Sequence, residues 1–544
     1  MSMRARRTQS LSMLGNGLAM LALAVLGGGL STLQTAPWPG VTPLQEPRLW
    51  ALAALLAFLA FSGWMLRPIR RDAATGSGIT GSGAAQWHVA YATQTGFALE
   101  LAQRTRDTLQ AAGITAELHD IANLDPADFK GGRWLFVAST TGEGDPPDHA
   151  LAFADRLLAA DGDLGATEHA VLALGDRGYA NYCQFGQQLE HWLLQRGSRR
   201  LFPRIEVDNA DAQALEQWQD QVGRLTGRSD LPAWERPQYQ PWRLTTRTLL
   251  NAGSPGGNVF HLALVPEPGT DAEWVAGDIA EIQPQNPETL IHAFLQASGF
   301  SGAETIRFLD APMTLREALA RSRLPQHEEA SGLDAQAVAN LLEPLPHREY
   351  SIASIPGDGE LQLLIRLMHR DDGTPGIGSG WLCNHARIGE AVRMRIRRNP
   401  SFHAPTPDTP MILIGNGTGL AGLRAHLKAR IAQSAGRNWL LFGERTLAHD
   451  AFHGAELEAW RDAGHITHLT RVFSRDGGAQ RYVQDALGAN SARLLQWLDD
   501  GAAVYVCGSQ EGMAPGVHAA LVDVLGRDRV DALISAGRYR RDVY

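Results

Sequence analysis

The heptad Arg348-Glu349-Tyr350-Ser351-Ile352-Ala353-Ser354 contains side chains that could hold a flat ring attached to a phosphate. On a strand, every second side chain faces the same way. Tyr350 could then pack on the ring while Arg348 meets the phosphate. An ordinary edge strand would explain the heptad equally well, so its meaning depends on the rest of the chain.

Two glycine-containing segments follow the heptad. Residues 376–382 (Gly-Ile-Gly-Ser-Gly-Trp-Leu) place small residues and a hydroxyl at the start of a predicted helix, which suits a pyrophosphate. Residues 411–414 form an apolar strand that runs into Gly415-Asn416-Gly417-Thr418-Gly419. A lone glycine loop of this kind is as often a structural turn, but its position after a phosphate motif favours nucleotide binding.

Three short apolar strands, at residues 88–92, 134–137 and 171–174, are each followed by a loop rich in hydroxyl and glycine residues. A helix is predicted over residues 98–112, directly after the first loop. Loops at the carboxyl ends of parallel strands are where a doubly wound sheet binds its ligand. Backbone N–H groups and threonine hydroxyls can bind a phosphate there without a lysine.

The order of these segments from Trp87 to Tyr544 resembles the NADPH-dependent diflavin reductases, the family of cytochrome P450 reductase and the sulfite reductase flavoprotein. The resemblance implies an α/β multidomain protein. It comprises a flavodoxin-like FMN domain (87–228), a linker (229–243), an antiparallel β-barrel FAD domain (244–405) with a short helical insert (about 287–345), and a Rossmann-like NADP domain of the ferredoxin-NADP reductase type (406–544). Electrons are expected to pass from NADPH to FAD, then singly to FMN and to an acceptor.

The resemblance assigns FMN to the three loops of the first domain, with Tyr179 as the residue that stacks on the ring. The implied FMN residues are Thr93, Gln94, Thr95, Gly96, Ala98, Thr140, Gly142, Glu143, Gly144, Gly175, Asp176 and Tyr179. Two positions depart from the family pattern: Phe97 replaces Asn or Thr, and Thr141 replaces Gln. These changes leave the phosphate loop intact and make the flavin affinity and potential harder to predict.

For FAD, the resemblance pairs Arg348 with the pyrophosphate, packs Tyr350 on the flavin and puts Ser351 near its N5 atom. Gly376, Gly378 and Ser379 complete the implied FAD set. The implied NADP residues are Gly415, Gly417, Thr418, Gly419, Ser474, Arg475, Arg481, Tyr482 and Gln484. A hydroxyl and two guanidiniums suit the adenosine 2'-phosphate, whereas an NAD site would place an acid there. NADPH is therefore expected over NADH.

Four residues are implied around the hydride path: Ser351, Cys507, Asp542 and Tyr544. A hydroxyl, a thiol and a carboxylate could stabilise the nicotinamide as charge develops. The terminal aromatic Tyr544 could lie on the flavin and be displaced by nicotinamide. Arg481 stands for the more usual Lys and keeps the charge. Asn416 and Ser509 also differ from the family pattern without changing chemistry that can be named.

The overall charge is −9, and the acidity lies mainly in one segment. Residues 86–226 hold 11 Lys or Arg and 20 Asp or Glu, a net of −9. Such a surface repels nucleic acid and favours a basic partner, although solubility alone would also explain it. The expected partner is an electron-accepting hemoprotein with a basic docking face. Ferric-chelate or quinone reduction, or a flavin-binding module without turnover, remain as alternatives.

Cysteines are scarce, since the chain has only Cys183, Cys383 and Cys507, far apart and without a C-x-x-C pair. A disulfide framework or zinc site is therefore not expected, and no metal residue is predicted. The chain also lacks a heme or iron–sulfur ligand motif, so the final reduction is assigned to FMN or a partner.

Residues 1–71 are predicted to form a membrane anchor with spans at about 11–33 and 49–66, and residues 72–86 a flexible tether. Both stretches are uncharged and bounded by arginines, which favours a hairpin with both ends in the cytoplasm. We therefore expect a multi-pass protein of a bacterial-type inner membrane with cytoplasmic catalytic domains. A cleaved signal peptide or core helices are the alternatives.

Overall fold

The computed structural model describes residues 86–544, except positions 143, 161, 178, 229–233, 235, 236, 271, 310 and 371 and the side chains of 158 and 159. Internal contacts divide the chain into two units, 1–83 and 84–544. Everything that follows concerns the second unit. The predicted anchor, the predicted tether up to residue 85 and seven of the fifteen residues of the predicted linker lie outside the described residues.

The membrane localisation predicted from the sequence is corrected by the structure. None of the helices in the described part of residues 86–544 combines the length and the apolar character that a membrane span needs. The longest described helices have 15 residues and span about 22 Å, short of the about 30 Å hydrocarbon core. The stretches that motivated the prediction, 11–33 and 49–66, lie outside the described residues.

The first sheet is parallel and has the strand order β2-β1-β3-β4, with β5 and β6 both paired to β4. Its strands are β1 (Trp87–Ala92), β2 (Ala116–Asp120), β3 (Arg133–Ser139), β4 (Glu168–Gly175), β5 (Arg199–Arg200) and β6 (Ile205–Asp208). Because the chain crosses from β2 back past β1 to β3, the topological switch point lies between β1 and β3. This is the flavodoxin-like order.

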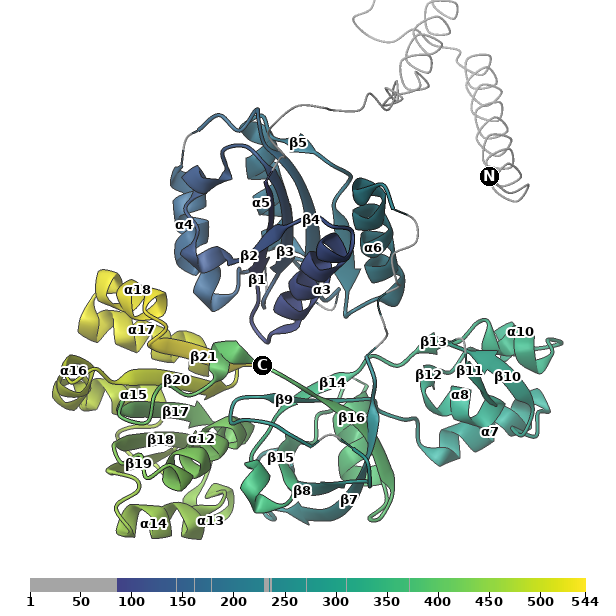
Figure 1. The fold of residues 1–544 in the computed structure, drawn as a ribbon. Helices are drawn as coiled ribbons and strands as arrows, with labels where there is room; N and C mark the ends of the chain where they lie inside the picture. The colour runs from purple at the N-terminus through teal and green to yellow at the C-terminus, as the bar shows by residue number, and fades with distance from the viewer. Residues whose placement is uncertain are drawn as a thin grey trace, which may run out of the picture. The chain divides into compact units, whose positions relative to one another are not determined.

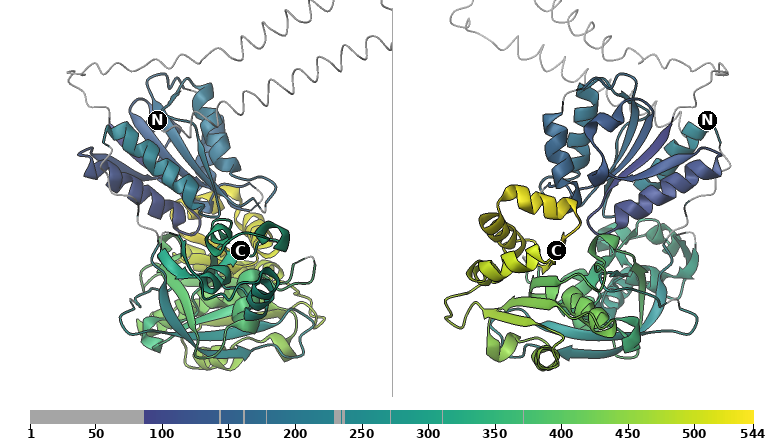
Figure 2. Two further views of the ribbon diagram at one scale, coloured as in Figure 1. Left: turned by 90° about the vertical axis from the view of Figure 1, so that its right-hand side faces the viewer. Right: turned by 60° about the vertical axis from the view of Figure 1, so that its left-hand side comes forward.

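Helices cover both faces of this sheet (Figures 1 and 2). One face packs on α3 (Phe97–Ala111) and α6 (Ala212–Thr226) through a core that includes Val89 and Trp218. The other packs on α4 (Leu151–Ala159) and α5 (Gln184–Gln195) through a core that includes Phe136. The central strands are buried on both faces, which explains why they read as apolar runs rather than as alternating patterns.

The second sheet is antiparallel, with the order β14-β9-β16-β7-β8-β15. Its strands are β7 (Gln240–Leu249), β8 (Val259–Pro266), β9 (Ile279–Ile282), β14 (Arg348–Ser351), β15 (Leu361–Arg366) and β16 (Ala391–Arg397). A bridge between Ile352 and Leu363 joins the two end strands, so the sheet closes on itself. Strand β9 begins only at Ile279, after Gly277 has turned at φ 102° against the carbonyl of Phe402.

The segment inserted before β14 combines short helices and short strands. The helices are α7 (Glu288–Ser298), α8 (Leu315–Ala320), α9 (His327–Ala330) and α10 (Ala335–Ala339). The strands are β10 (Thr305–Phe308), β11 (Ala311–Thr314), β12 (Ser322–Arg323) and β13 (Glu343–Pro344). This segment has its own core, which includes Phe294 and Leu319.

The third sheet is parallel, with the order β19-β18-β17-β20-β21. Its strands are β17 (Met411–Asn416), β18 (Asn438–Glu444), β19 (His468–Phe473), β20 (Ala503–Gly508) and β21 (Tyr539–Val543). Its helices are α12 (Leu420–Ala432), α13 (Leu447–Asp450), α14 (Gly454–Asp462), α15 (Val483–Ala489), α16 (Ser491–Asp499), α17 (Met513–Leu525) and α18 (Arg527–Ser535). The switch point lies between β17 and β20, where a Rossmann-like fold binds its dinucleotide. The predicted α/β architecture of the first and last domains is confirmed.

Candidate functional site

The loops that follow β1 and β3 meet at the switch point of the first sheet. In the β1 loop, the amide of Gly96 donates to the hydroxyl of buried Thr93 at 3.0 Å. Gly96 has φ 88°, and a Cβ there would lie 2.4 Å from the carbonyl oxygen of Arg398. Only glycine fits so close an approach. The loop is therefore a tight, hydroxyl-rich turn at the start of α3, a form that suits a phosphate.

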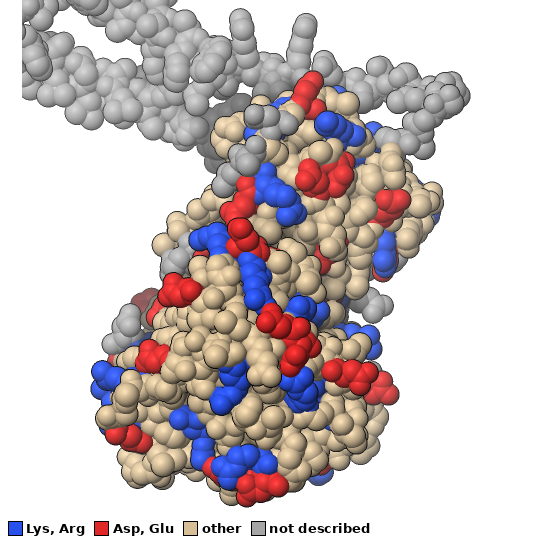
Figure 3. Space-filling view, turned by 90° about the vertical axis from the view of Figure 1, so that its left-hand side faces the viewer, with Lys and Arg blue, Asp and Glu red and all other residues tan. Residues whose placement is uncertain are grey.

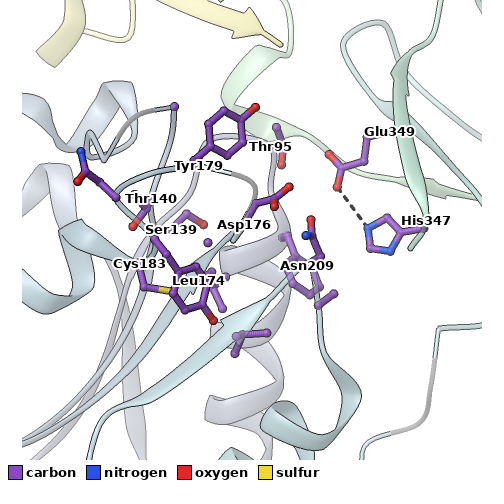
Figure 4. Close-up of a pocket in the computed structure, with 17 residues that line it drawn as sticks. Thr95, Ser139, Thr140, Leu174, Asp176, Tyr179, Cys183, Asn209, His347 and Glu349 are labelled. Atoms are coloured by element: carbon purple, nitrogen blue, oxygen red, sulfur yellow. Dashed lines mark ion pairs between the residues drawn. The ribbon is translucent and has the colours of Figure 1, made fainter. Parts of the chain in front are cut away.

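A cavity of about 170 Å³ opens beside this turn (Figure 4). Six of the twelve residues predicted for FMN line it: Thr95, Thr140, Gly142, Gly175, Asp176 and Tyr179. They come from the loops after β1, β3 and β4, so the sheet brings together three segments up to about 85 residues apart in the chain. Gly142 has φ 48°, a conformation that favours glycine.

The other predicted FMN residues lie outside the cavity wall. Thr93, Gly96, Ala98 and Gly144 shape the loops or the base of α3, and Glu143 lies outside the described residues. The side chain of Gln94 turns instead to Asp148 at 3.1 Å and to the carbonyl oxygen of Arg541 at 3.0 Å. Gln94 thus connects the first loop to strand β21.

Several residues that the sequence analysis missed also line this cavity. Asn209 and Ala210 follow β6 with φ of 46° and 61°. The rule that ligands bind beyond the carboxyl ends of parallel strands would have identified them. Glu349 lies in β14 of the antiparallel sheet and His347 directly precedes that strand; the two form an ion pair at 3.6 Å, drawn in Figure 4. No local pattern could have assigned these two to the cavity.

A larger cavity of about 1210 Å³ lies between the antiparallel sheet and the third sheet. Its volume exceeds the roughly 300 to 1,000 Å³ of most single-ligand sites, so it can hold more than one ligand. The predicted residues that line it are Arg348, Tyr350, Ser351, Gly376, Gly378, Ser379, Gly417, Thr418, Ser474, Arg475, Arg481, Tyr482, Gln484 and Tyr544. Tyr179 lines both cavities.

The glycines of this cavity are required by close packing. A Cβ at Gly378 would lie 2.6 Å from both the Cγ of Arg348 and the hydroxyl of Tyr350. Gly417 has φ 56° and borders the open cavity. Gly415 and Gly419 do not line it; a Cβ at either would strike the carbonyl oxygen of Cys507. Gly415 and Gly419 thus let the loop 415–419 pack closely on β20. The middle of that loop lines the cavity, where its backbone could contact a nucleotide.

Basic and aromatic side chains gather at the far end of the large cavity. Arg475 is exposed, and no acidic partner is found for it among the described residues. The guanidinium of Arg481 lies 5.8 Å from the ring centre of Tyr482, and its Nε donates to the carbonyl oxygen of Ser474 at 3.4 Å. Glu444 is also present, but Arg366 and Arg445 pair with it. Two guanidiniums thus remain available for an anionic group.

A buried hydroxyl, thiol and carboxylate meet beside Tyr350. The hydroxyl of Ser351 donates to Oδ2 of Asp542 at 2.6 Å, and the Sγ of Cys507 lies 3.7 Å from the same oxygen. Strands β20 and β21 are parallel and in register, with Cys507 opposite Asp542, so both side chains face the same side. Ser351 reaches them from the antiparallel sheet. Of the three, Ser351 lines the cavity.

Burial changes the acidity of this cluster. It raises the pKa of Asp542 above the ordinary carboxyl value, although hydrogen bonds from Ser351 and Cys507 oppose the change. Burial, together with the nearby Asp542, raises the pKa of the Cys507 thiol well above its usual value. Cys507 is therefore a thiol rather than a thiolate, and its chemistry here is polar contact rather than nucleophilic attack.

The terminal Tyr544 lines the large cavity and is 54% exposed. Its backbone is held by hydrogen bonds with Gly508 and Gln510. Burial of its hydroxyl raises the phenol pKa well above its usual value. The last residue is therefore docked against the Ser351 cluster with one side of its ring open.

Comparison with known proteins agrees with this geometry. The Flavodoxin family model matches residues 89–218, and the Oxidoreductase NAD-binding domain model matches residues 413–519. The sulfite reductase [NADPH] flavoprotein alpha-component of Vibrio cholerae is 29% identical over 84% of this chain and 87% of the relative. That of Neisseria meningitidis serogroup C is 29% identical over 83% and 88%, respectively.

The relative from Yersinia enterocolitica bears the same name and is 30% identical over 83% of this chain and 89% of its own length. A match of this extent spans more than four fifths of the chain. The family predicted from the motifs is confirmed. The chain belongs to the family of the sulfite reductase flavoprotein alpha-component.

Proposed function

We propose that this chain is an NADPH-dependent diflavin oxidoreductase that passes electrons to a heme-protein acceptor. FAD, FMN and NADPH are its cofactors. The observation that carries the proposal is the large cavity, which is lined by both Ser351 and the cationic Arg475 and Arg481. Behind its wall, Ser351 contacts Asp542, and Asp542 contacts Cys507. Tyr179 lines both this cavity and the one formed by the three flavodoxin loops, which supports a path between the two.

In this proposal, the chain's own residues bind and orient the cofactors. Arg348 and the glycine segment 376–379 hold the FAD pyrophosphate, and Tyr350 packs on its ring system. The loop 415–419 and the cations at 475 and 481 hold NADPH, with the two guanidiniums on the 2'-phosphate. Thr95, Thr140 and Asp176 contact FMN, with Tyr179 against its ring. The bound flavins supply the redox chemistry, taking a hydride from NADPH and releasing its two electrons one at a time.

The buried cluster positions and stabilises the reacting nicotinamide. Ser351 directs its hydroxyl at Asp542 and holds the carboxylate in place. A carboxylate so close to the cavity favours positive charge on a nicotinamide, which develops as hydride leaves. Tyr544 covers this region from the solvent side and excludes water until NADPH displaces its ring.

The acceptor is proposed to be a hemoprotein with a basic docking face, and a sulfite-reducing heme partner is the first candidate. The flavodoxin-like segment 86–226 carries an excess of nine acidic residues, which supports attraction of a basic partner. On the face drawn in Figure 3, acidic and basic side chains are interspersed, without one large patch of either sign. The attraction is therefore expected from the domain as a whole, and electron transfer should slow as ionic strength rises.

The test is to purify the protein, release its flavins with acid and quantify FAD and FMN by chromatography. NADPH oxidation is then followed with a heme protein as the acceptor. Stoichiometric amounts of both flavins and NADPH-dependent heme reduction are expected. FAD alone would mean that Phe97 and Thr141 had abolished the FMN site. Equal rates with a ferric chelate or a quinone as the acceptor, and none with heme proteins, would overturn the acceptor assignment.

A further inference from the structure

Three potential metal ligands lie side by side on the first sheet, away from both cavities. His88 in β1 is directly opposite Glu117 in β2, and His119 is two residues further along β2. Side chains two apart on a strand share a face. All three therefore face the same side, the one covered by α4 and α5, and their ligand atoms lie within 4.8 Å of one another.

The three distances match the edges of a metal coordination sphere. His88 Nδ1 lies 3.0 Å from His119 Nε2, and Glu117 Oε2 lies 3.6 Å from the first nitrogen and 3.5 Å from the second. In a tetrahedral zinc site with bonds of about 2.0 to 2.1 Å, neighbouring ligand atoms are about 3.3 Å apart. The observed triangle is thus one face of such a tetrahedron.

The surroundings hold these ligands in place and leave one side open. His88 stacks on Trp134, the residue in register with it on β3, with ring centres 4.2 Å apart and planes at 17°. Gln86 donates to the other carboxylate oxygen of Glu117 at 3.3 Å. The side chains of His88 and His119 are 12% and 25% exposed, while that of Glu117 is 55% exposed. The open side can supply a water as the fourth ligand.

A second group of similar composition shows why the first stands out. Glu281, His347 and Glu349 also bring their ligand atoms together. There, Arg395 makes two hydrogen bonds to Glu281 at 2.9 Å, and Arg397 contacts Glu349 at 2.5 Å. Arginines already neutralise those carboxylates, so a metal cation would be repelled. Among the described residues, Glu117 forms ion pairs with His88 and His119 and with no Lys or Arg.

We propose that His88, Glu117 and His119 form a binding site for a divalent metal ion of the zinc class. Two imidazoles and one carboxylate suit zinc and similar transition metals, whereas magnesium and calcium prefer ligand sets made of oxygen. The family resemblance predicted no metal site, and the scarcity of cysteine led us to expect no zinc site. This site uses no cysteine.

The metal's role is structural and separate from electron transfer. His88 is the second residue of β1, and the flavin loop begins five residues later at Thr93. A strand rises about 3.3 Å per residue, so the two sites lie about 16 Å apart, at opposite ends of β1. A metal ion here would cross-link β1 to β2, the edge strand of the sheet. It would add to the backbone hydrogen bonds that pair the two strands.

The experiment uses the flavin-loaded protein, freed of any polyhistidine tag and treated with a chelator. Zn²⁺ is titrated in by calorimetry, with Mg²⁺ as the comparison ion. We expect saturable binding of one Zn²⁺ per chain and no binding of Mg²⁺. X-ray absorption at the zinc edge should show nitrogen and oxygen neighbours at about 2.0 to 2.1 Å, with imidazole scattering and no sulfur.

Glu117→Gln and His119→Ala test the ligands, and His191→Ala is the matched control on the exposed side of α5. Loss of a second-shell partner already weakens metal binding by about 10 to 100-fold, so loss of a ligand should weaken it by about 100-fold or more. The control should bind like wild type, and all variants should retain FMN. Zinc should also raise the melting temperature of wild type and of the control, but not of the ligand variants.

Absence of zinc binding by wild type would overturn the proposal, as would unchanged affinity in both ligand variants. If the variants fold poorly, the X-ray absorption spectrum of the wild-type protein still tests the ligand set. Sulfur among the zinc ligands, or the absence of imidazole, would contradict the proposed site.

Discussion

Replacing Arg397 with alanine should weaken FMN binding while sparing FAD. The Arg397 side chain is 3% exposed and contacts Glu349, which lines both cavities. Its Nη1 donates to the carbonyl oxygen of Thr95 at 2.7 Å, in the loop proposed to hold the FMN phosphate. The same guanidinium contacts Glu349 at 2.5 Å and Glu281 at 3.3 Å. One side chain therefore ties the flavodoxin loop to strands β9 and β14.

The size of the effect follows from the burial of this network. Burial raises the pKa of Glu281, but His347, Arg395 and Arg397 outweigh it and hold the pKa at about 2. Relative to the ordinary 4.5, that difference is worth about 3 kcal/mol. Breaking a buried ion pair costs about 3 to 5 kcal/mol. Because Arg395 still pairs with Glu281, we expect a loss of about 3 kcal/mol for Arg397→Ala.

If that loss falls on the Thr95 loop, FMN binding weakens by up to about 100-fold. The assay is a fluorescence titration of FMN into flavin-depleted protein, with FAD content measured in parallel. Arg398→Ala is the matched control, because Arg398 is adjacent in sequence and exposed. Arg397→Lys should be intermediate, since it keeps the charge but loses the forked donors. Unchanged FMN affinity in Arg397→Ala would refute the reasoning.

The same network also makes a prediction about acid stability. Because the pKa of Glu281 is lowered in the folded protein, its stabilisation is fully present above about 4.5 and is lost as pH falls through about 2. Arg397→Ala should shift that loss to a higher pH, which thermal unfolding at a series of acidic pH values would measure. Overlapping curves for Arg397→Ala and wild type would contradict this assignment.

Three further predictions concern the large cavity. Arg475→Ala should raise the KM for NADPH, because a charge-assisted contact worth about 1.5 to 3 kcal/mol is lost, and it should leave NADH kinetics unchanged. Equal increases of KM for both nucleotides would contradict the assignment of Arg475 to the 2'-phosphate site. Tyr544→Ala should improve NADH use more than NADPH use, because aromatic packing of about 0.5 to 1.5 kcal/mol no longer opposes nicotinamide. Tyr544→Trp should keep the preference for NADPH over NADH. Steady-state kinetics with both nucleotides measure this preference, and an unchanged preference in Tyr544→Ala would contradict the role given to Tyr544. Asp542→Asn should slow NADPH oxidation, and its stability should exceed that of wild type as pH rises. The reason is that the pKa of Asp542 is raised in the folded protein, so wild type loses stability as pH rises above the pKa of the unfolded carboxyl. A stability difference that does not change with pH in denaturant titrations would contradict this prediction.

Much of the architecture could be predicted because its signals are local. Thr140 and Tyr179 follow apolar strands in loops of hydroxyl and glycine residues, and parallel strands bring such loops to one edge. The predicted strand at 411–414 lies within β17, and that at 171–174 lies within β4. Turns and buried strands depend on residues that are neighbours in the chain, so they can be predicted from the sequence. Half of the predicted FMN residues nevertheless do not line the cavity, because position in a loop does not determine where a side chain points.

From its sequence, this protein could be assigned to its family, and loops that border its two cavities could be located. Only the tertiary structure decided that Arg397 reaches Thr95, 302 residues away, and that Glu349 faces the flavodoxin loops. The structure alone also joined His88 to Glu117 and His119. Each of these contacts depends on strand pairing, register and domain packing, which arise from the burial of many side chains at once. No local pattern encodes them, because the partner of a polar side chain is chosen by which surfaces the folded cores bring together.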